Sequence, residues 1–347
     1  MSEQDILPPY AEGEVIDGLK SLAITELDGY LQGKLKFKNS TNPEAIPIRL
    51  KGDWGQLVES RLLTAVYVVQ PFAIPRPKSL LGHENWQLIL DHIATIREEF
   101  PATAFRTFRI SAAGSDSAVF QRLKEQLAAD TGLTLDEEEA DLLVRIRRDK
   151  AVWEVLIRLT PRPLGTRPWR VANMPGALSG PLAAAVNLLT DPQPNDHYLN
   201  IMCGSSSILV ERLGGADAAV AVGVDLNPEA LQASQQNLAA AGVSAALVLA
   251  DGMQLPFRAA SFDALTADLP WGQLVGSHEQ NEWLYPAVLA EAARVTRPYG
   301  RFVIITHEVQ LMQETLDSFK NLWKVENELK LQQGNIRPRI YKLRRLN

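Results

Sequence analysis

The second half of the sequence alternates between strand and helix patterns, and this alternation restricts the possible folds more than any other feature. The strand patterns are short apolar runs at residues 197–203, 218–226, 244–251, 261–269 and 300–306. Helical patterns lie between most of them, at residues 206–213, 227–241 and 281–296, and another precedes them at 177–189. Strands that alternate with helices form parallel sheets covered on both faces. We therefore predict an α/β domain.

Two further strand patterns near the end of the sequence follow one another without a helix between them. They read WKVENELKL and RPRIYKLRRL, at residues 323–331 and 337–346. Two strands joined by a short connection pair in antiparallel fashion. We predict a terminal antiparallel hairpin added to the parallel sheet.

The first half mixes helices and strands without regular alternation. Residues 84–100 and 117–132 have helical spacing, whereas ADLLVRIRRD and AVWEVLIRLT, within residues 140–160, predict a hairpin. Such a mixture is typical of an α+β arrangement. Prolines interleaved with arginines predict a stiff connector over residues 161–175. Residues 1–12 carry no pattern, and we predict a flexible tail there.

The composition excludes several classes of protein. A chain of 347 residues suffices for about two domains, and a single cysteine, Cys203, excludes a disulfide framework. Residues 1–20 hold no apolar run behind a basic region, so we expect a cytoplasmic protein without a membrane anchor. Five scattered histidines lack the spacing of metal ligands, and we expect no metal. A net charge of −6 gives no global attraction for polyphosphates.

Three acidic residues, Asp225, Asp251 and Asp268, end three consecutive strand patterns. Ligands of an open parallel sheet bind beyond the carboxyl ends of its strands. One acid at such a place commonly begins a loop or caps a helix, but three at equivalent places indicate a binding site. Asp225 lies 21 positions after Gly204, close to the roughly 20-residue spacing at which a carboxylate binds ribose hydroxyls. Asp251, one strand further, would then meet the adenine.

The loop after the first strand pattern indicates which nucleoside compound binds. It reads CGSSSI and lacks the full G-x-G-x-x-G of nicotinamide enzymes. We therefore predict an adenosine without an obligatory pyrophosphate, as in S-adenosylmethionine.

The sequence DLPWG, residues 268–272, follows the fourth strand pattern. The exocyclic amine of a base is a poor nucleophile because its lone pair is conjugated with the ring, and a hydrogen-bond acceptor in the amine plane localises that lone pair. Asp268 supplies an acceptor, Pro270 fixes the turn, and Trp271 offers a face on which an extruded base can stack. These residues predict methyl transfer to a base amine, in which alignment of the reactants carries most of the rate.

These motifs resemble those of Rossmann-like methyltransferases that modify exocyclic amines. DLPWG resembles the Asp-Leu-Pro-aromatic-Gly variant of the RNA guanine-N2 methyltransferases that carry a THUMP domain, and LNIMCGSSSILVERL resembles their cofactor loop. Upstream, VIDGLKSLAITEL resembles their ferredoxin-like region, and FRISAAGSDS and ADLLVRI resemble the THUMP core. The resemblance spans nearly the whole chain. It implies a tail at 1–12, a ferredoxin-like region at 13–75, a THUMP RNA-binding domain at 76–160, a linker at 161–175 and a methyltransferase domain at 176–347.

The resemblance also implies roles for individual residues. Asp268, Pro270 and Trp271 would hold the target base. The residues that would bind S-adenosylmethionine are Pro175, Gly176, Asn200, Met202, Cys203, Gly204, Ser205, Ser206, Asp225, Leu226, Asp251, Gly252 and Asp268. The substrate would be structured RNA, typically the acceptor end of tRNA, methylated on N2 of a guanosine. We expect the protein to be a monomer.

Three positions differ from the cofactor loop of that family. Asn200 stands where the family has Asp, Ile201 where it has Pro, and Ser206 where it has its second Gly. Asn lacks the charge of Asp, and a Cβ at residue 206 can crowd the cofactor. A second hypothesis is therefore an RNA-binding protein whose methyltransferase fold has lost its activity. A third is an adenine-N6 methyltransferase, because the Asp-x-Pro-aromatic turn serves both amines. For Cys203 we favour packing over a role as nucleophile.

Overall fold

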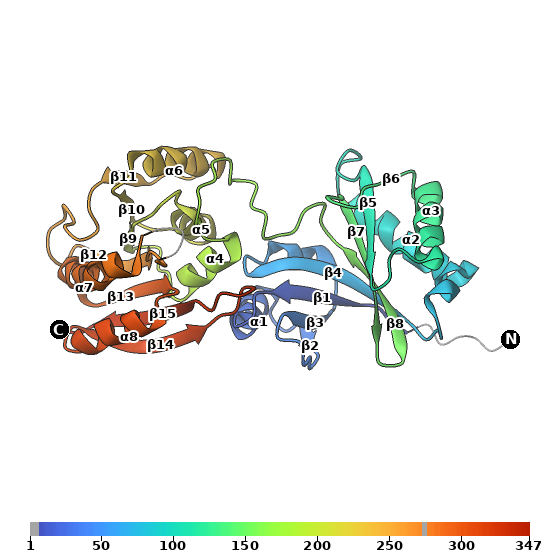
Figure 1. Cartoon of the computed structure of the whole chain (residues 1–347), viewed down its shortest axis with the longest axis horizontal. Helices are drawn as coiled ribbons and strands as arrows, with labels where there is room; N and C mark the ends of the chain where they lie inside the picture. Colours follow the sequence, from blue (N-terminus) through green and yellow to red (C-terminus); the bar gives the residue numbers. More distant parts are fainter. Residues whose placement is uncertain (1–6, 273–275) are drawn as a thin grey trace. The chain divides into compact units, whose positions relative to one another are not determined.

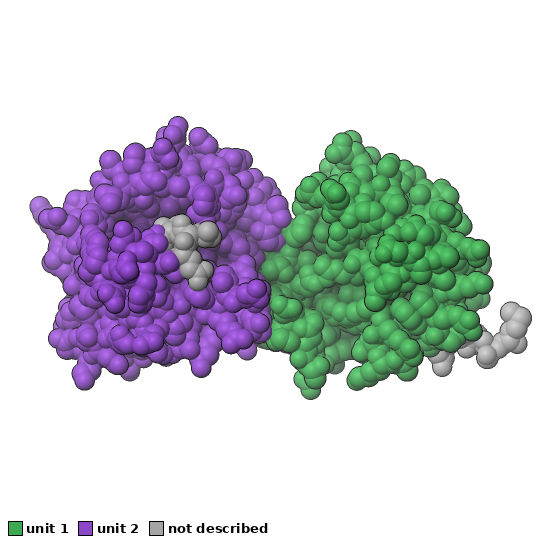
Figure 2. Space-filling view, in the orientation of Figure 1, with its two compact units in different colours: residues 1–15, 23–164 green, residues 16–22, 165–347 purple. Residues whose placement is uncertain are grey.

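The computed structural model in Figure 1 describes residues 7–272 and 276–347. The chain forms two compact units, which are coloured separately in Figure 2. Unit 1 consists of the described residues up to 15 and of residues 23–164, and unit 2 of residues 16–22 and 165–347. Each unit is built on a sheet of its own.

Unit 1 contains an eight-stranded sheet in the order β2-β3-β1-β4-β8-β7-β5-β6. Helix α2 contacts β4 and β8, and α3 contacts β5 and β6. The predicted hairpin within residues 140–160 is confirmed as the antiparallel pair β7 and β8. One sheet spans residues 13–75 and 76–160, so a division between these two ranges stays a prediction. The elements are β1 Tyr10–Val15, α1 Lys20–Leu31, β2 Leu35–Phe37, β3 Ala45–Leu50, β4 Leu63–Phe72, α2 His83–Glu98, β5 Thr107–Ala112, α3 Ala118–Thr131, β6 Thr134–Leu135, β7 Leu142–Asp149 and β8 Val152–Arg158, with short 3-10 helices at Trp54–Glu59 and Pro77–Leu81.

The predicted flexible tail over residues 1–12 is wrong for its last residues. Tyr10–Val15 forms β1, which lies inside the sheet between β3 and β4, whereas residues 1–6 lie outside the described residues. The strand shows no apolar alternation because it carries Glu12 and Glu14. Both carboxylates form ion pairs with arginines of β7, which allows Glu12 to be buried.

Unit 2 contains a seven-stranded sheet in the order β11-β10-β9-β12-β13-β15-β14. The five strands from β11 to β13 run parallel, as the alternation of patterns predicts. The predicted terminal hairpin is confirmed as β14 and β15, which extends the sheet beyond β13. The strands are β9 His197–Ile201, β10 Val220–Asp225, β11 Ala246–Leu249, β12 Phe262–Asp268, β13 Thr296–Thr306, β14 Trp323–Lys330 and β15 Arg339–Arg345. The strand order reverses at β9, and ligands of such sheets bind beyond the carboxyl ends of the strands at this reversal.

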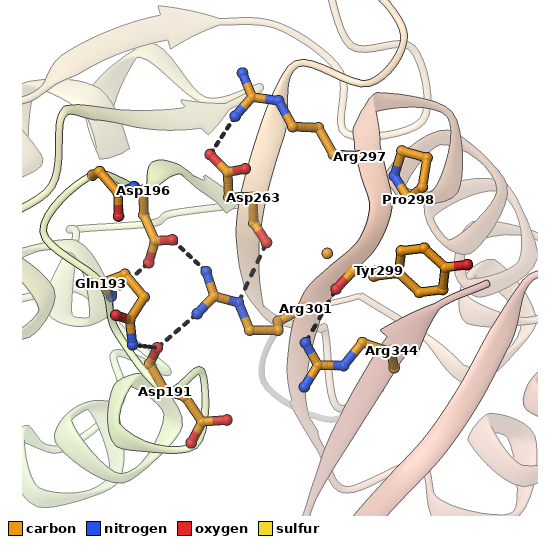
Figure 3. Close-up of a pocket in the computed structure, with 11 residues that line it drawn as sticks. Asp191, Gln193, Asp196, Asp263, Arg297, Pro298, Tyr299, Arg301 and Arg344 are labelled. Atoms are coloured by element: carbon orange, nitrogen blue, oxygen red, sulfur yellow. Dashed lines mark hydrogen bonds and ion pairs between the residues drawn. The ribbon is translucent and has the colours of Figure 1, made fainter. Parts of the chain in front are cut away.

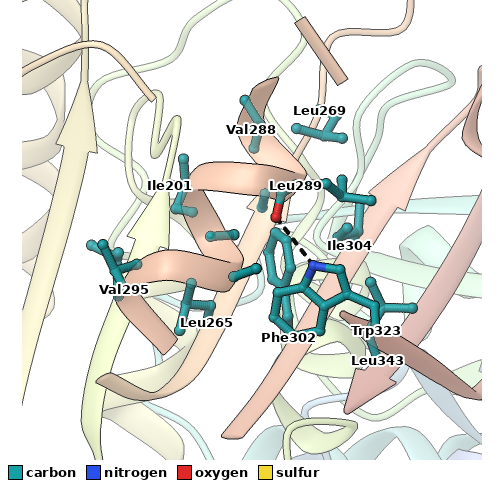
Figure 4. Close-up of a cluster of buried hydrophobic side chains, with 14 of the residues drawn as sticks. Ile201, Leu265, Leu269, Val288, Leu289, Val295, Phe302, Ile304, Trp323 and Leu343 are labelled. Atoms are coloured by element: carbon teal, nitrogen blue, oxygen red, sulfur yellow. Dashed lines mark hydrogen bonds between the residues drawn. The ribbon is translucent and has the colours of Figure 1, made fainter. Parts of the chain in front are cut away.

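Helices cover both faces of the sheet of unit 2. Because successive residues of a strand point to opposite faces, Tyr198 of β9 packs with α5 and α6 on one face, while Leu199 packs with α7 and α8 on the other. Figure 4 shows the second cluster, in which Nε1 of Trp323 donates to the carbonyl of Leu289 at 3.1 Å. The helices are α4 Gly180–Leu188, α5 Ser207–Gly215, α6 Pro228–Ala240, α7 His278–Val295 and α8 Val309–Ser318. In the described part of the chain, no helix has the length and apolarity needed to cross a membrane.

Residues 16–22 belong to unit 2 although the residues on either side of them belong to unit 1. The N–H of Gln332 donates to the carbonyl of Asp17 at 3.1 Å. Gly18 has a φ of +96°, and a Cβ there would lie 2.1 Å from the carbonyl oxygen of Lys330, so only glycine fits. Unit 2 is therefore assembled from two separate stretches of sequence.

Candidate functional site

The three predicted acids lie along one edge of the sheet of unit 2. Asp225 ends β10, and Asp268 ends β12. Ile201 ends β9, which pairs with both of these strands. Asp251 follows β11, the other neighbour of β10. In sheet order, the edge therefore presents Asp251, Asp225, the loop after Ile201 and Asp268.

The loop between β9 and α5 turns sharply at residues 202–206. Met202, Gly204 and Ser206 have φ values of 54°, 53° and 64°, a region that disfavours residues with a Cβ. Within the described residues, no atom beyond the neighbours in the chain lies within 4 Å of where a Cβ of Gly204 would be. The backbone at Gly204 therefore faces open space, and a ligand can approach it closely.

Asp225 holds this loop in place. Its Oδ2 accepts from the N–H of Gly204 at 2.8 Å, and its Oδ1 accepts from the N–H of Asn227 at 2.9 Å. Each carboxylate oxygen has a further lone pair, so Asp225 can also accept hydrogen bonds from hydroxyls of a ligand. Asn227 in turn caps α6, because its Oδ1 accepts from the N–H of Glu229 at 2.9 Å.

Asp251 lies beyond the neighbouring strand. Its Oδ1 accepts from the N–H of Met253 at 2.8 Å, and the residue is partly exposed. Gly252 is buried, and a Cβ there would lie 3.1 Å from Cγ2 of Ile201 and 3.3 Å from Cγ of Met202. The absence of a side chain at Gly252 thus allows the loop after β11 to pack closely against the loop after β9.

Asn200 and Ser206, the two polar departures from the family's cofactor loop, are both buried. The Oγ of Ser206 lies 2.8 Å from the Oγ of Ser234 in α6, so its side chain points toward that helix. The Nδ2 of Asn200 donates to the carbonyl of Thr266 at 3.3 Å. Its Oδ1 has no hydrogen-bond partner among the described residues. A buried acceptor without a partner costs free energy, which a ligand that donates to it can recover.

The carboxyl group of Asp268 has a shifted protonation equilibrium. Desolvation by the surrounding protein raises its pKa from 3.8 to about 7, although a hydrogen bond from Nε1 of Trp271 opposes the shift. That bond reaches Oδ1 of Asp268 and is 3.1 Å long. Asp268 as a whole is partly exposed, so the raised pKa reflects a carboxyl group that is poorly hydrated but still accessible to solvent. Acids with strongly shifted pKa values are frequent at functional sites.

The DLPWG turn is held by residues of α7. The carbonyl of Pro270 accepts from Nδ2 of Asn281 at 2.9 Å and from Oη of Tyr285 at 2.6 Å. Both lone pairs of this carbonyl are therefore in use. Gly272 has a φ of +71°, a backbone conformation that favours glycine, and a Cβ there would also displace the Glu308 side chain. The sequence does not indicate this role of Asn281 and Tyr285, because the helical pattern marks them only as part of a helix.

Trp271 is in contact with a second aromatic ring. Its indole stacks on the imidazole of His307, with ring centroids 6.0 Å apart and 28° between the planes. His307 directly follows β13, the strand beside β12. This stack covers one face of the indole, and Trp271 as a whole is partly exposed. The sequence does not indicate this contact of His307, because a lone histidine after a strand pattern has no feature that predicts it.

The remaining predicted site residues differ in exposure. Pro175, Gly176 and Leu226 are exposed. Cys203 is buried, and burial together with the charge of Asp225 raises the pKa of its thiol to about 12. A thiol that stays protonated is a poor nucleophile, which agrees with a packing role. Within residues 7–272 and 276–347, no three His, Cys, Asp or Glu side chains gather in a way that could hold a metal ion.

A polar cavity of about 520 Å³ lies at the opposite, amino-terminal ends of β9 and β12. Figure 3 shows that its charges pair with one another: Arg301 contacts Asp196, and Arg297 contacts Asp263. Nη1 of Arg344 donates to the carbonyl of Tyr299 at 3.1 Å. These internal pairs indicate a structural role for the cavity, and the candidate site is the edge that carries the three acids.

The chain is similar in sequence to known methyltransferases. Residues 167–337 match the model of a family described as UPF0020: RMKL-like, methyltransferase domain. The chain is 28% identical over 222 residues to the tRNA (guanine(6)-N(2))-methyltransferase THUMP3 of Mus musculus, covering 60% of this chain and 43% of that protein. It is 29% identical over 233 residues to the tRNA (guanine(6)-N2)-methyltransferase of Thermus thermophilus, covering 66% of this chain and 68% of that protein. This chain thus spans less than half the length of the mammalian relative.

Solved structures share the fold over nearly the whole chain. TrmN from Thermus thermophilus superposes with a TM-score of 0.76 at 22% identity, covering 98% of this chain and 100% of that one. SMU.472, described as a methyltransferase complexed with SAH, superposes with a TM-score of 0.67 at 14% identity, covering 97% of this chain and 98% of that one. These likenesses show that both units have the fold of such proteins.

Proposed function

We propose, from the premise that residues 167–337 of this chain belong to the RMKL-like methyltransferase family, that the protein methylates RNA. The methyl group passes from S-adenosylmethionine to the exocyclic N2 amine of a guanosine, in the acceptor stem of tRNA. The observation that carries the proposal is the place of Asp268, which ends β12 beside β9 and its loop and holds the indole of Trp271. The names of the mouse and Thermus relatives support the substrate.

The residues at the strand ends fit S-adenosylmethionine. Three buried polar atoms there lack a partner among the described residues: Oδ1 of Asn200, Oγ of Ser205 and Oγ of Ser207. Buried polar atoms are normally paired, and the amino and carboxylate groups of a methionine moiety supply such partners. Asp225 has lone pairs left for ribose hydroxyls, and Asp251 has them for the adenine edge. When bound, the cofactor supplies a methyl group carried on a positively charged sulfur.

Residues of the chain align the acceptor amine. Asp268 accepts a hydrogen bond from the amine through Oδ2, because Oδ1 already accepts from Trp271. Trp271 stacks on the base with the face that is turned away from His307. Asn281 and Tyr285 fix the turn through the carbonyl of Pro270. Such alignment is worth several kcal/mol in reactions between two bound groups, on the order of 7 kcal/mol in favourable cases.

The acceptor role of Asp268 is strongest when the residue is ionised. Because the pKa of its carboxyl group is about 7, the ionised and neutral forms coexist at neutral pH. The neutral form carries a proton on one oxygen and is a weaker acceptor. Methyl transfer is therefore expected to increase as the pH rises through about 7.

Recognition of the RNA is assigned to unit 1. Residues 76–160 are the proposed THUMP domain, residues 13–75 the ferredoxin-like region and residues 161–175 the linker. RNA recognised by shape, with one extruded base, suits a chain of net charge −6. A monomeric state and a cytoplasmic location belong to the same proposal.

Two alternatives differ from this proposal in what they predict. The hypothesis of an RNA-binding protein without activity rests on Asn200 and Ser206. The hydroxyl of Ser206, however, is buried and hydrogen-bonded to Ser234. An adenine-N6 methyltransferase would use the same turn. The guanine-N2 relatives favour the first proposal over both.

The experiment uses methyl-labelled S-adenosylmethionine and bulk RNA from cells that lack the gene. Digestion of the labelled RNA should yield N2-methylguanosine from the small-RNA fraction. Asp268→Ala should abolish the transfer and leave cofactor binding nearly intact. Asp263→Ala, at the other end of β12, is the matched control and should retain activity. Label in N6-methyladenosine, or full activity of Asp268→Ala, would overturn the proposal, and RNA binding without any label would favour the inactive protein.

A further inference from the structure

Helix α6 carries two polar side chains on the face that it buries. Ser234 and Asn237 have no exposed surface, and they lie three residues apart, on the same side of the helix. Buried polar groups destabilise a protein unless they are hydrogen-bonded. The identity of their partners therefore shows what these two residues do.

Ser234 contacts the loop after β9. Its Oγ donates to the carbonyl of Gly204 at 2.6 Å and lies 2.8 Å from the Oγ of Ser206. Ser206 has a left-handed backbone and directly precedes α5. Ser234 thus fixes the loop at two points that flank Ser205.

Asn237 binds two backbone segments at once. Its Oδ1 accepts from the N–H of Val171 at 3.0 Å and of Ala172 at 2.9 Å. Its Nδ2 donates to the carbonyls of Ala172 at 2.9 Å and of Ser205 at 3.0 Å. These four bonds use both lone pairs of the oxygen and both N–H groups of the nitrogen. The carboxamide therefore ties the segment at Val171 to the loop at Ser205.

The segment tied by Asn237 is fixed a second time nearby. Nε of Arg167 lies 2.7 Å from Oε1 of Glu211 in α5, and the Glu211 side chain has no exposed surface. The Arg167–Glu211 ion pair attaches this segment to α5, and the hydrogen bonds of Asn237 attach it to α6. Residues 167–172 are therefore attached to both helices that flank the loop. The chain reaches Pro175 and Gly176 three and four residues after Ala172, and the resemblance assigns these two residues to the methionine end of the cofactor.

We propose that Asn237 is a positioning residue for the methyl donor, supported by Ser234. It acts through the backbone: it holds residues 171–172, which lead to Pro175 and Gly176, in register with the loop at residues 204–206. This inference rests on the proposed function and deepens it, because it names the residue that joins the two borders of that site. Loss of the carboxamide lets the segments move independently, so the donor must order them when it binds.

The test measures S-adenosylmethionine binding by isothermal titration calorimetry on the full chain. Asn237→Leu keeps the branched shape of the side chain and removes all four hydrogen bonds, and we expect the Kd for the donor to rise about tenfold or more. With RNA as substrate, the KM for the donor should rise while kcat at saturating donor stays within about twofold. Ser234→Ala, a milder change, should raise the same Kd by about threefold.

The matched control is Asn187→Leu. Asn187 is a buried asparagine of α4 whose Nδ2 donates to the carbonyls of Ala183 and Ile208, and it bonds neither border of the site. It should lower the melting temperature and leave the Kd for the donor within about twofold. If Asn237→Leu raises that Kd no more than Asn187→Leu does, the inference is wrong and the proposed function stands.

Two other results are also decisive. If Asn237→Leu does not fold, Ser234→Ala decides: an unchanged Kd overturns the inference, and a raised Kd at an unchanged affinity for RNA supports it. A wild-type chain that fails to bind S-adenosylmethionine overturns the proposed function and the inference together.

Discussion

The indole nitrogen of Trp271 donates a hydrogen bond to Oδ1 of Asp268 over 3.1 Å. The bond joins the acid that we assign to the amine with the ring that we assign to the base. Because Trp271 also stacks on His307, the orientation of the carboxylate is fixed from β13 as well as from its own strand. Changes at either partner are therefore expected to affect both functions.

Trp271→Phe should shift the pH dependence of methyl transfer. The variant keeps a ring against His307 but loses the N–H that stabilises the ionised carboxylate, so the pKa of Asp268 should rise further above about 7. The acidic limb of kcat/KM against pH should move to higher pH, and activity at pH 7 should fall. His307→Phe, which retains a ring and the indole bond, is the control. An acidic limb that stays in place in Trp271→Phe would contradict this role of the indole.

Asp268→Asn should stabilise the protein at alkaline pH. The folded-state pKa of Asp268 is raised from 3.8 to about 7, so its contribution to stability is fully present below pH 4 and is lost as the pH rises through 7. Asn is neutral throughout. The gain in free energy of unfolding should therefore be near zero at pH 4 and on the order of 2 kcal/mol at pH 8, with allowance for partial exposure. Urea unfolding at both pH values tests this, and an equal gain at both would contradict it.

Ser206→Gly should be more stable than Ser206→Ala. Both variants lose the hydrogen bond to Ser234, but only glycine adopts the left-handed conformation at φ 64° without strain. We expect a difference of about 1 kcal/mol in the free energy of unfolding, measured in urea. Equal stabilities would mean that the backbone at residue 206 changes conformation once the hydroxyl is lost.

Asp196→Ala should be strongly destabilising although Asp196 lies far from the acids of the site. Its carboxylate contacts Arg301 and lies 3.3 Å from Nη2 of the fully buried Arg212. Removing it leaves buried positive charge without compensation, which costs about 3–5 kcal/mol. Glu326→Ala breaks the more exposed pair with Arg344 and should cost less than about 1 kcal/mol. Thermal denaturation compares the stabilities of the two variants. Similar losses of stability in both would contradict the stronger role that we assign to Asp196.

The sheet of unit 2 could be predicted because its signals are local. Apolar runs of strand length, helical spacing between them and an acid at three of the strand ends are all visible within a few residues, and they indicate the edge that carries Asp225, Asp251 and Asp268. The hairpins were equally visible, since both strands of each lie close together in the sequence. The strand at Tyr10–Val15 was not visible, because its acidic residues are compensated by arginines more than 130 positions away.

The residues that support the site were not predictable for the same reason. Asn237 lies 65 positions from Ala172 and 32 from Ser205, and its helical neighbours give no sign that its partners are backbone atoms. Tyr285 and His307 likewise gain their roles only when α7 and β13 meet the DLPWG turn. The sequence also left the direction of the Ser206 side chain open. The structure directs it toward Ser234, where it forms a hydrogen bond.

The interrupted sequence of unit 2 determines how the two units can be recombined with those of other proteins. Because Asp17 pairs with Gln332 in the connection between β14 and β15, a gene fragment that starts at the connector lacks residues 16–22 of unit 2 and exposes Leu331, which is buried in the full chain. The two units therefore cannot be separated by one cut at the connector. A chimera that joins unit 2 of this chain to the first unit of a relative therefore has to keep residues 16–22 of this chain, because they belong to unit 2 although they are embedded in the sequence of unit 1.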